Sequence, residues 1–556
     1  MTDIVAPVFA RTVAAALPRI AIAHQQGADM IELRCDEASG ETIMALLAHP
    51  QIRIKPVIVT IRSKAEGGLF PGSELQRLAL LAQTCRWQPD YIDIEYEAWR
   101  AHPEMVQKIL PLLADRNDDR RGKPRLILSY HDLAARPADL RERLVAMAKI
   151  VPARIIKAAY QAANLPDALE ALRLYHDLRE TITQPLVLIA MGDAGLITRL
   201  LAAKYDAAFT FAVPVGDDTT APGQPTIRDL MEIYRFKKQQ RSWPVFGVAG
   251  WPVAHSISPV IHNAGFEAVD FAGLYVPLPI MPPYESFRGT VELLRQTPEL
   301  NLQGLSVTIP HKANAARYVK DDGGTLDETS TRIGVINTVY FHESNQTRGV
   351  NSDWIGAINA LRAGTGWNRN ALARKRIAVV GAGGAARAIV AGLASLGVTV
   401  VIYNRTLQHA EELAAEFNGK TGQVWAAPLA QFFTTNCAVV INCTPAGMAP
   451  CTESLPVANP EVLHSGMVVF DTVYNPRRTR FLEIAAARGA TIIEGLEMLL
   501  YQAVVQFEGF TGKPAPLKIM RAAAEKALEF NAQNLRFGSR PALPGPLPKA
   551  PDQISL

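Results

Sequence analysis

The first 240 residues repeat one pattern of short apolar runs separated by amphipathic stretches. Apolar and β-branched residues dominate eight runs, at 4–10, 28–34, 55–62, 90–96, 124–131, 153–160, 185–192 and 207–213. Helix-like stretches such as LQRLALLAQTC and LRERLVAMAKI lie between them. Continuous apolar strands that alternate with amphipathic helices are typical of a parallel sheet covered by helices. Eight such units predict an N-terminal (β/α)8 TIM barrel.

The rest of the chain is also of the α/β class but is divided differently. A polar, basic junction, YRFKKQQRSW, precedes a new series of strands and helices. The helix-rich stretch 480–530 and a proline-rich end follow. We expect four segments: the barrel (1–238), a substrate domain (243–350 with 480–535), a Rossmann-type dinucleotide domain (351–479) and a disordered tail (538–556).

Composition and charge exclude several classes of protein. The 556 residues contain 57 basic and 53 acidic side chains, so no strong field favours nucleic acid or an anionic membrane. No apolar run approaches the roughly 20 residues that span a bilayer. The N-terminal sequence has no signal-peptide pattern, and five scattered cysteines form no CxxC pair. We expect a cytoplasmic protein, and the absence of a histidine or cysteine ligand cluster predicts no metal site.

Polar side chains stand at the ends of separate barrel strands, where such folds place their chemistry. A lysine in the apolar strand IIKAAY, Lys157, can be kept neutral by its surroundings and attack a carbonyl. His131 can move protons near neutral pH. The other candidates are carboxylates and arginines that suit a polar, anionic substrate: Glu32, Arg34, Arg62, Asp93, Glu95 and Arg199.

These motifs resemble type I 3-dehydroquinate dehydratase over residues 4–235. The resemblance rests on IELR (31–34), TIRSKAEGG (60–68), SYHD (129–132), IIKAAY, AMGDAGLITR (190–199) and TAPGQPT (220–226). It implies that Lys157 forms a Schiff base with the substrate, that His131 is the general acid/base and that Arg199 binds the carboxylate. It further implies that the remaining substrate contacts come from Glu32, Arg34, Arg62, Gln224 and Thr220, the last standing where the family often has serine.

A glycine-rich turn follows the apolar run IAVV and opens a helix. Its sequence, Gly381-Ala382-Gly383-Gly384-Ala385-Ala386, fits GxGxxA, in which glycines let the backbone approach a pyrophosphate at the helix N-terminus. The next strand ends in Asn404-Arg405-Thr406. Because an arginine stands where NAD enzymes usually carry an acid, Arg405 favours NADP(H) as the cofactor.

Four short loops contain a second set of candidates: HSISP (255–259), SVTIPHK (306–312), GVINTV (334–339) and GVNSDW (349–354). If the fold brings Lys312 and Asp353 together, they can transfer a proton. With INCTPAGM, DTVYNP and EGLEMLLYQAVVQFEGFTG, these loops resemble shikimate dehydrogenase over residues 244–530.

That second resemblance implies specific roles. Lys312 and Asp353 would be the catalytic pair. Ser256 and Ser258 would bind the substrate carboxylate, and Thr308, Asn337, Asp353 and Gln502 would hold its hydroxyl groups. Thr444 and Met498 would lie near the nicotinamide, and Gly495 would also bind the cofactor. Departures from the stand-alone bacterial pattern are Ser306, His311 and Glu497.

The order of the two halves resembles the plant-type bifunctional enzyme. That likeness implies that 3-dehydroquinate is dehydrated to 3-dehydroshikimate, which NADPH then reduces to shikimate. NAD-dependent quinate oxidation is an alternative, and so is a non-catalytic metabolite-sensing regulator. The sequence leaves oligomeric state and channelling open, and small molecules are the only partners that it predicts.

Overall fold

The computed structural model describes residues 1–117, 122–215, 223–254, 256–341, 346–419, 422–434 and 436–536. The predicted tail at 538–556 lies outside these residues. The chain divides into two compact units, Met1–Ile355 with Gln502–Pro516 and Gly356–Tyr501 with Leu517–Leu556. No helix in the described residues is both long and apolar enough to cross a membrane.

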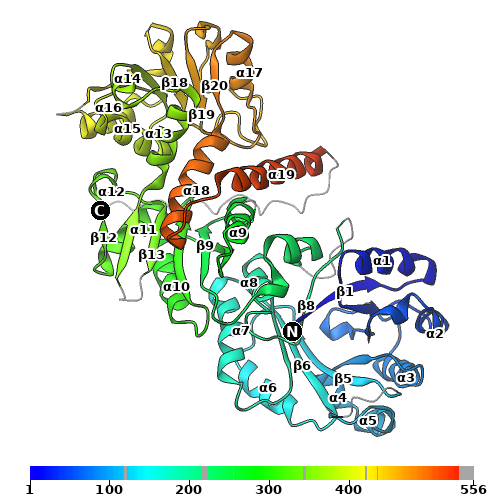
Figure 1. Cartoon of the computed structure of the whole chain (residues 1–556). Helices are drawn as coiled ribbons and strands as arrows, with labels where there is room; N and C mark the ends of the chain where they lie inside the picture. The colour runs from blue at the N-terminus through cyan, green and yellow to red at the C-terminus, as the bar shows by residue number, and fades with distance from the viewer. Residues whose placement is uncertain are drawn as a thin grey trace, which may run out of the picture. The chain divides into compact units, whose positions relative to one another are not determined.

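The N-terminal strands form one eight-stranded parallel sheet in the order β7-β6-β5-β4-β3-β2-β1-β8 (Figure 1). The strands are β1 (Asp3–Phe9), β2 (Met30–Arg34), β3 (Val57–Thr60), β4 (Tyr91–Glu95), β5 (Arg125–Asp132), β6 (Ala153–Gln161), β7 (Leu186–Met191) and β8 (Phe209–Phe211). At the seam, the amide of Ala208 donates to the carbonyl of Leu186 at 2.8 Å. The sheet is thus a nearly closed barrel, which confirms the predicted fold.

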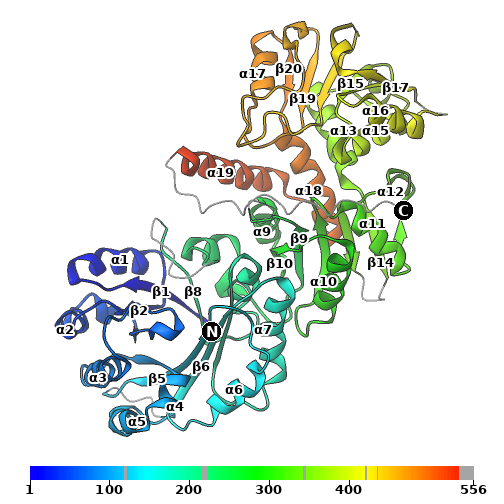
Figure 2. The same cartoon turned by 180° about the vertical axis from the view of Figure 1, so that it is seen from behind.

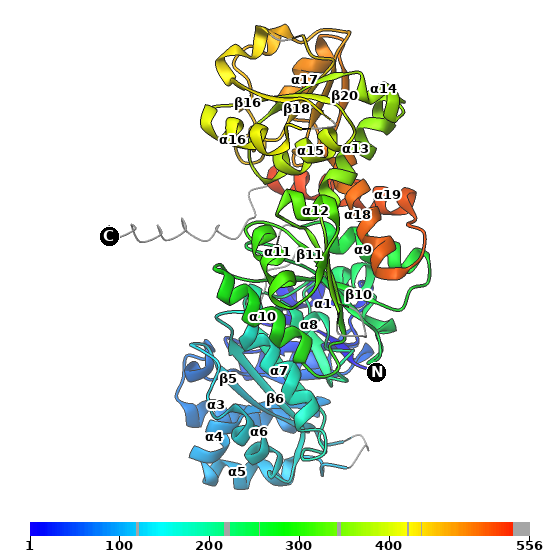
Figure 3. The same ribbon diagram turned by 90° about the vertical axis from the view of Figure 1, so that its left-hand side faces the viewer.

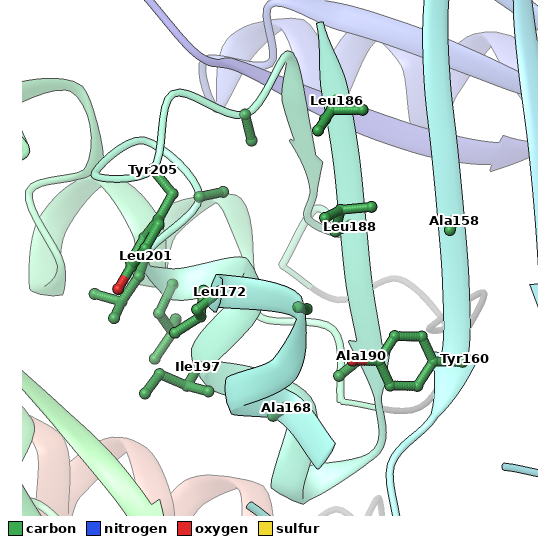
Figure 4. Packing of buried hydrophobic residues seen from close by; sticks show 14 of the residues in the cluster. Ala158, Tyr160, Ala168, Leu172, Leu186, Leu188, Ala190, Ile197, Leu201 and Tyr205 are labelled. Carbon is green, nitrogen blue, oxygen red and sulfur yellow. The ribbon is translucent and has the colours of Figure 1, made fainter. Parts of the chain in front are cut away.

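Helices cover the outside of this barrel (Figure 3). They are α1 (Val13–Gln25), α2 (Gly40–Ala48), α3 (Glu74–Cys85), α4 (Tyr96–Ala101), α5 (Pro103–Ile109), α6 (Leu140–Ala148), α7 (Leu165–Asp177) and α8 (Leu196–Leu200). Figure 4 shows the packing between this layer and the strands: Tyr160 on β6 and Leu188 on β7 face Leu172 on α7 and Ile197 on α8.

Strand alternation decides which side chains enter the barrel, because successive residues point to opposite faces. Ala158 and Tyr160 on β6 belong to the outer core, whereas Ile155 and Ala159 belong to an inner cluster with Phe211. Lys157 lies between the two inner residues. The period of the strand therefore places the lysine inside the barrel.

A second sheet of six strands has the order β10-β9-β11-β13-β14-β12. Its strands are β9 (Val245–Gly250), β10 (Leu274–Pro279), β11 (Leu302–Val307), β12 (Thr325–Leu326), β13 (Thr338–Phe341) and β14 (Thr347–Val350). The accompanying helices are α9 (Ser258–Ala268), α10 (Tyr284–Gln296), α11 (Lys312–Asp321), α12 (Glu328–Ile333) and α13 (Ser352–Thr365). Strands β10, β9 and β11 are parallel, and β13 is antiparallel to β11. The candidate loops 255–259 and 306–312 therefore follow the ends of two neighbouring parallel strands, β9 and β11.

The second unit holds a parallel sheet in the order β17-β16-β15-β18-β19-β20, which is the 3-2-1-4-5-6 order of dinucleotide-binding folds. Its strands are β15 (Arg376–Val380), β16 (Thr399–Asn404), β17 (Val424–Pro428), β18 (Val439–Asn442), β19 (Val468–Asp471) and β20 (Thr491–Ile493). Its helices include α14 (Arg369–Ala373), α15 (Gly384–Ser395), α16 (Leu407–Phe417) and α17 (Arg480–Ala487). Figure 2 shows α16 along β17 and α17 along β20.

The predicted division at residues 479 and 480 needs a correction. Strand β20 pairs in parallel with β19, and α17 packs on both, so this part of 480–535 completes the dinucleotide sheet. Helix α18 (Gly495–Thr511) passes from one unit to the other, and α19 (Leu517–Arg536) belongs to the second unit. Only Gln502–Pro516 returns to the first unit. An apolar helix pattern does not reveal which sheet the helix covers.

Candidate active sites

The centre of the barrel is a network of buried charges around Lys157. The ammonium donates to Asp93 Oδ2 at 3.0 Å, and it lies 4.8 Å from the ring centre of Phe211. Arg62 binds both oxygens of Asp93 at 3.0 Å and also contacts Glu95 at 3.0 Å. Burial alone would raise the pKa of Asp93, but the charges of Arg62 and Lys157 outweigh it and hold that pKa far below its ordinary value. Asp93 is therefore a permanent acceptor for the lysine.

His131 is paired with a carboxyl group that the sequence did not single out. Its Nδ1 lies 2.8 Å from Oε2 of Glu66, which is on a short turn after β3. Burial, followed by the charges of Arg62 and Lys157, lowers the pKa of His131 well below its ordinary value. Burial raises the pKa of Glu66 to about 8, although Arg62 opposes it. The imidazole and the carboxyl group can thus share one proton near neutral pH.

Arg199 is a buried cation that has no carboxylate partner in the described part of the chain. It lies on α8, is 2% exposed, and its Nε and Nη1 have no hydrogen-bond partner among the described residues. Burial lowers its pKa to about 10, so it remains charged. Because a buried unpaired charge is unfavourable, this guanidinium suits an incoming anion.

Two other predicted barrel residues, Glu32 and Arg34, lie on β2 and have partners of their own. Glu32 is buried and accepts from Thr60 Oγ1 at 2.8 Å, and Arg34 pairs with Asp36 at 2.8 Å. Gln224 follows the segment after β8, where the amide of Val213 donates to the carbonyl of Pro225 at 3.0 Å. Thr220 lies outside the described residues.

In the second sheet the fold joins the two members of the predicted proton-transfer pair. Lys312 starts α11 and Asp353 lies in the first turn of α13, and their Nζ and Oδ2 atoms are 2.5 Å apart. Asn337 donates to Asp353 Oδ1 at 2.9 Å and to Gln502 Oε1 at 3.3 Å. Asn337, Asp353 and Gln502 are all buried, so the carboxylate is held from both sides.

Hydroxyl groups lie at the neighbouring strand ends. Ser256 follows β9, Ser258 opens α9, and the Ser258 amide donates to Ser256 Oγ at 3.3 Å. Thr308 comes directly after β11, the parallel neighbour of β9. Ser258 also lies beside the hydroxyl of Tyr275. Burial raises the pKa of Tyr275, and the side chains of Ser306 and Ser258 only partly oppose this rise. Tyr275 is a further polar group near these hydroxyls. The sequence pattern did not reveal it, because Tyr275 lies in an otherwise apolar strand.

The glycine turn of the second unit has the space that a dinucleotide phosphate needs. Gly381 has a φ of +107°, and a Cβ there would lie 3.0 Å from Thr444. A Cβ at Gly383 or Gly384 would meet nothing within 4 Å, and Gly384 begins α15. The open backbone at a helix N-terminus fits a pyrophosphate, and Ala382 and Ala385 complete this turn.

The end of β16 lies next to this turn, because Val380 pairs with Tyr403. Asn404 donates to the carbonyl of Thr406 at 2.8 Å. Arg405 is exposed, so its charge is available to an anion. An exposed arginine at this position suits a 2′-phosphate better than an acid would.

The remaining cofactor candidates also lie in the second unit. Thr444 follows β18 and donates to Asn442 Oδ1 at 2.7 Å. Gly495 opens α18, where a Cβ would lie 2.4 Å from the carbonyl of Val473, so no larger residue fits. Met498 is buried one turn later. Glu497, the departure from the usual small residue, binds Arg521 of α19, with Oε2 and Nη2 2.8 Å apart.

Four family models match the chain in order. Type I 3-dehydroquinase matches residues 4–241, and the shikimate dehydrogenase substrate binding domain matches 248–339. Shikimate / quinate 5-dehydrogenase matches 367–478, and the shikimate 5'-dehydrogenase C-terminal domain matches 495–525.

The described residues contain no cluster of three or more His, Cys, Asp or Glu side chains suited to a metal ion.

Known proteins match either the whole chain or its second half. The shikimate dehydrogenase (NADP(+)) of Methanothermobacter thermautotrophicus is 37% identical over 51% of this chain and 96% of its own length. A structure of shikimate 5-dehydrogenase from Thermus thermophilus with NADP(H) and shikimate is 31% identical, with a TM-score of 0.45, over 51% of this chain and 99% of its own. The chloroplastic bifunctional 3-dehydroquinate dehydratase/shikimate dehydrogenase of Arabidopsis thaliana is 33% identical over 93% of this chain and 83% of its own length. The chain belongs to the family of bifunctional 3-dehydroquinate dehydratase/shikimate dehydrogenases, two-activity enzymes of the shikimate pathway.

Proposed function

We propose that Lys157 is the amine that attacks the ketone of 3-dehydroquinate. The observation behind this proposal is a lysine inside the barrel whose Nζ contacts Asp93, a carboxylate already neutralised by Arg62. Asp93 holds the amine in place through this contact, and His131, the general acid/base, can accept the proton that the ammonium must release. Arg199 binds the substrate carboxylate, while Glu32, Arg34, Arg62, Gln224 and Thr220 contact the rest of the substrate.

The dehydration follows from this arrangement in balanced steps. The Lys157 nitrogen bonds to the ketone carbon, and the ketone oxygen leaves as water to give a protonated imine. His131 removes a proton from the adjacent carbon, and the electron pair moves into the imine nitrogen. The hydroxyl group one carbon further on then leaves with a proton from His131. Water hydrolyses the imine, which restores Lys157 and releases 3-dehydroshikimate.

Borohydride reduction tests the imine directly. Treating the enzyme with 3-dehydroquinate and borohydride should leave a stable adduct on the peptide that contains Lys157, detected by mass spectrometry. The same treatment without substrate is the control. An unmodified Lys157 peptide in an active enzyme would refute the proposed nucleophile.

For the second reaction we propose that Lys312 and Asp353 transfer the proton at the reacting oxygen. NADPH, when bound, supplies a hydride to the carbonyl carbon of 3-dehydroshikimate. Lys312 protonates the oxygen on which negative charge develops, and Asp353 holds the lysine at 2.5 Å. Ser256 and Ser258 bind the carboxylate, and Thr308, Asn337 and Gln502 orient the hydroxyl groups.

We propose NADP(H) as the cofactor, held by residues of the second unit alone. The glycine turn (Gly381–Ala385) receives the pyrophosphate, and Asn404, Arg405 and Thr406 receive the adenosine end. Thr444 and Met498 lie near the nicotinamide, and Gly495 also binds the cofactor. The open turn and the exposed Arg405 support this assignment over NAD, and so over NAD-dependent quinate oxidation.

One coupled assay tests both activities at once. Enzyme mixed with 3-dehydroquinate and NADPH should consume NADPH, because the first product is the second substrate. No consumption would contradict both enzymatic proposals and would favour the metabolite-sensing regulator. Replacing NADPH with NADH in the same assay separates the two cofactors.

We assign the dehydratase to residues 1–238, shikimate binding to 243–350 with Gln502–Pro516, and cofactor binding to Gly356–Tyr501. We also propose a cytoplasmic location, supported by five free cysteines in the described residues. Small molecules are the proposed partners. The net charge of +4 supports no binding to nucleic acid.

A further inference from the structure

One buried amide of the first unit has no role in the reactions above. Gln506 lies on α18, one helical turn after Gln502, and is 2% exposed. Its Oε1 accepts from Ser306 Oγ at 2.8 Å. Its Nε2 donates to Thr338 Oγ1 at 3.1 Å and to the backbone carbonyl of Asn337 at 3.3 Å. Both ends of the amide are therefore satisfied, and only a group with a donor and an acceptor can replace it.

These contacts bind Gln506 to two paired strands. Ser306 on β11 lies opposite Thr338 on β13 in the antiparallel register. The amide of Gln506 bridges the side chains of this cross-strand pair and ties the helix to the sheet. Ser306 is one of the departures from the usual bacterial pattern; its hydroxyl donates to Gln506 and lies beside the hydroxyl of Tyr275.

The series of contacts continues from Gln506 through Asn337 to the proton-transfer pair. Asn337, whose backbone Gln506 holds, uses its side chain to donate to Asp353 Oδ1 at 2.9 Å and to accept from the Ser352 amide at 2.7 Å. The other oxygen of Asp353 receives Lys312. A shift of the Asn337 backbone would therefore turn the carboxylate away from the lysine.

We propose that the buried pair Ser306–Gln506 is a positioning element for shikimate dehydrogenation, which fixes Asn337 and thereby orients Asp353 toward Lys312. The pair is hydrogen-bonded to protein groups of β11 and β13. Its contribution is to the alignment of the proton-transfer pair, so it acts on the chemical step more than on substrate binding. The inference rests on the proposed roles of Lys312 and Asp353.

Kinetics of shikimate oxidation with NADP⁺ test this pair in the full-length enzyme. We expect Gln506→Ala and Ser306→Ala each to lower kcat by roughly 10- to 100-fold, since small misplacements of reacting groups cost about that much. KM for shikimate should change far less. The double variant should be no slower than the slower single variant, because both changes break one linkage. Ser306→Thr, which keeps the hydroxyl donor, should retain a kcat close to that of the wild-type enzyme.

The controls separate positioning from general damage. Thr297→Val removes another buried hydroxyl of the same unit, one that donates to the carbonyl of Leu293 at 2.7 Å, and should leave kcat unchanged. Dehydratase activity, measured on each variant, reports that the unit is folded. Additive effects of Ser306→Ala and Gln506→Ala, or an unchanged kcat in both, would overturn the proposal. A wild-type enzyme that fails to oxidise shikimate would instead refute the proposed function.

Discussion

Two buried arginines in one barrel should respond in opposite ways to the same substitution. Arg62 is surrounded by Asp93 and Glu95, whereas Arg199 lacks a carboxylate partner among the described residues. We therefore predict that Arg199→Met stabilises the unliganded barrel and that Arg62→Met destabilises it. Both side chains are almost fully buried, so the contrast arises from their partners and not from their depth.

The size of each effect follows from the charges. Burial lowers the pKa of Arg199 to about 10, a shift that corresponds to about 3 kcal/mol of unfavourable burial and sets the upper limit of the gain. Removing Arg62 leaves two buried carboxylates with too few partners, a loss of about 3 to 5 kcal/mol. If Arg199 binds the substrate carboxylate, its replacement also removes a charge-assisted contact of about 1.5 to 3 kcal/mol, or roughly a 10- to 150-fold rise in KM.

Hydrogen exchange of peptides from β6 and β7 measures the stability of the barrel within the full chain. Steady-state dehydratase kinetics on the same preparations give KM for 3-dehydroquinate. We expect slower exchange with a raised KM for Arg199→Met, and faster exchange for Arg62→Met. Equal destabilisation by both substitutions would refute the argument, as would an unchanged KM for Arg199→Met.

Further predictions concern single groups in either site. Lys157→Ala should abolish dehydration and leave shikimate oxidation intact, as two separate assays on one preparation would show; loss of both activities would contradict separate sites. Asp353→Asn should lower the dehydrogenase kcat by about 10²- to 10⁴-fold, because an amide can satisfy only one of its two donors; the dehydratase rate is the control. Arg405→Ala should raise KM for NADPH but not for NADH, and comparable wild-type kcat/KM values for both cofactors would rule out the proposed preference. Glu66, with a pKa of about 8, keeps a proton on the Glu66–His131 pair below that pH, so His131 is available as a base mainly above pH 8. In Glu66→Gln, the increase of dehydratase kcat with pH should therefore occur at lower pH. An unchanged pH profile would disprove the coupling.

Much of the architecture could be read from local pattern. All eight barrel strands were predicted, because each is a continuous apolar run between amphipathic helices, and the period of β6 already places Lys157 on the face opposite Ala158 and Tyr160. The glycine turn was equally readable, since only glycine fits the positive φ of Gly381. The division near residue 480 was wrong, because the three-residue strand β20 gives no pattern of its own.

Contacts between distant residues were beyond local pattern. Motifs named Lys312 and Asp353 as candidates, but only the fold shows that 41 positions of sequence separation become 2.5 Å. Glu66 and Gln506 were missed because one lies on a short turn and the other on an apolar helix, where a single polar residue has no periodic signal. Their importance comes from the partner atoms, His131 Nδ1 and Ser306 Oγ.

By itself, then, the amino-acid sequence determined the elements, the two families and the residue types available for chemistry, because hydrophobic period and motif spacing are local properties. The tertiary structure decided which of those residues face one another, which charges are paired, and which, like Arg199, have no carboxylate partner among the described residues. The physical reason is that pairing energy and desolvation depend on distance and burial in three dimensions, and neither quantity is encoded in the order of a short segment.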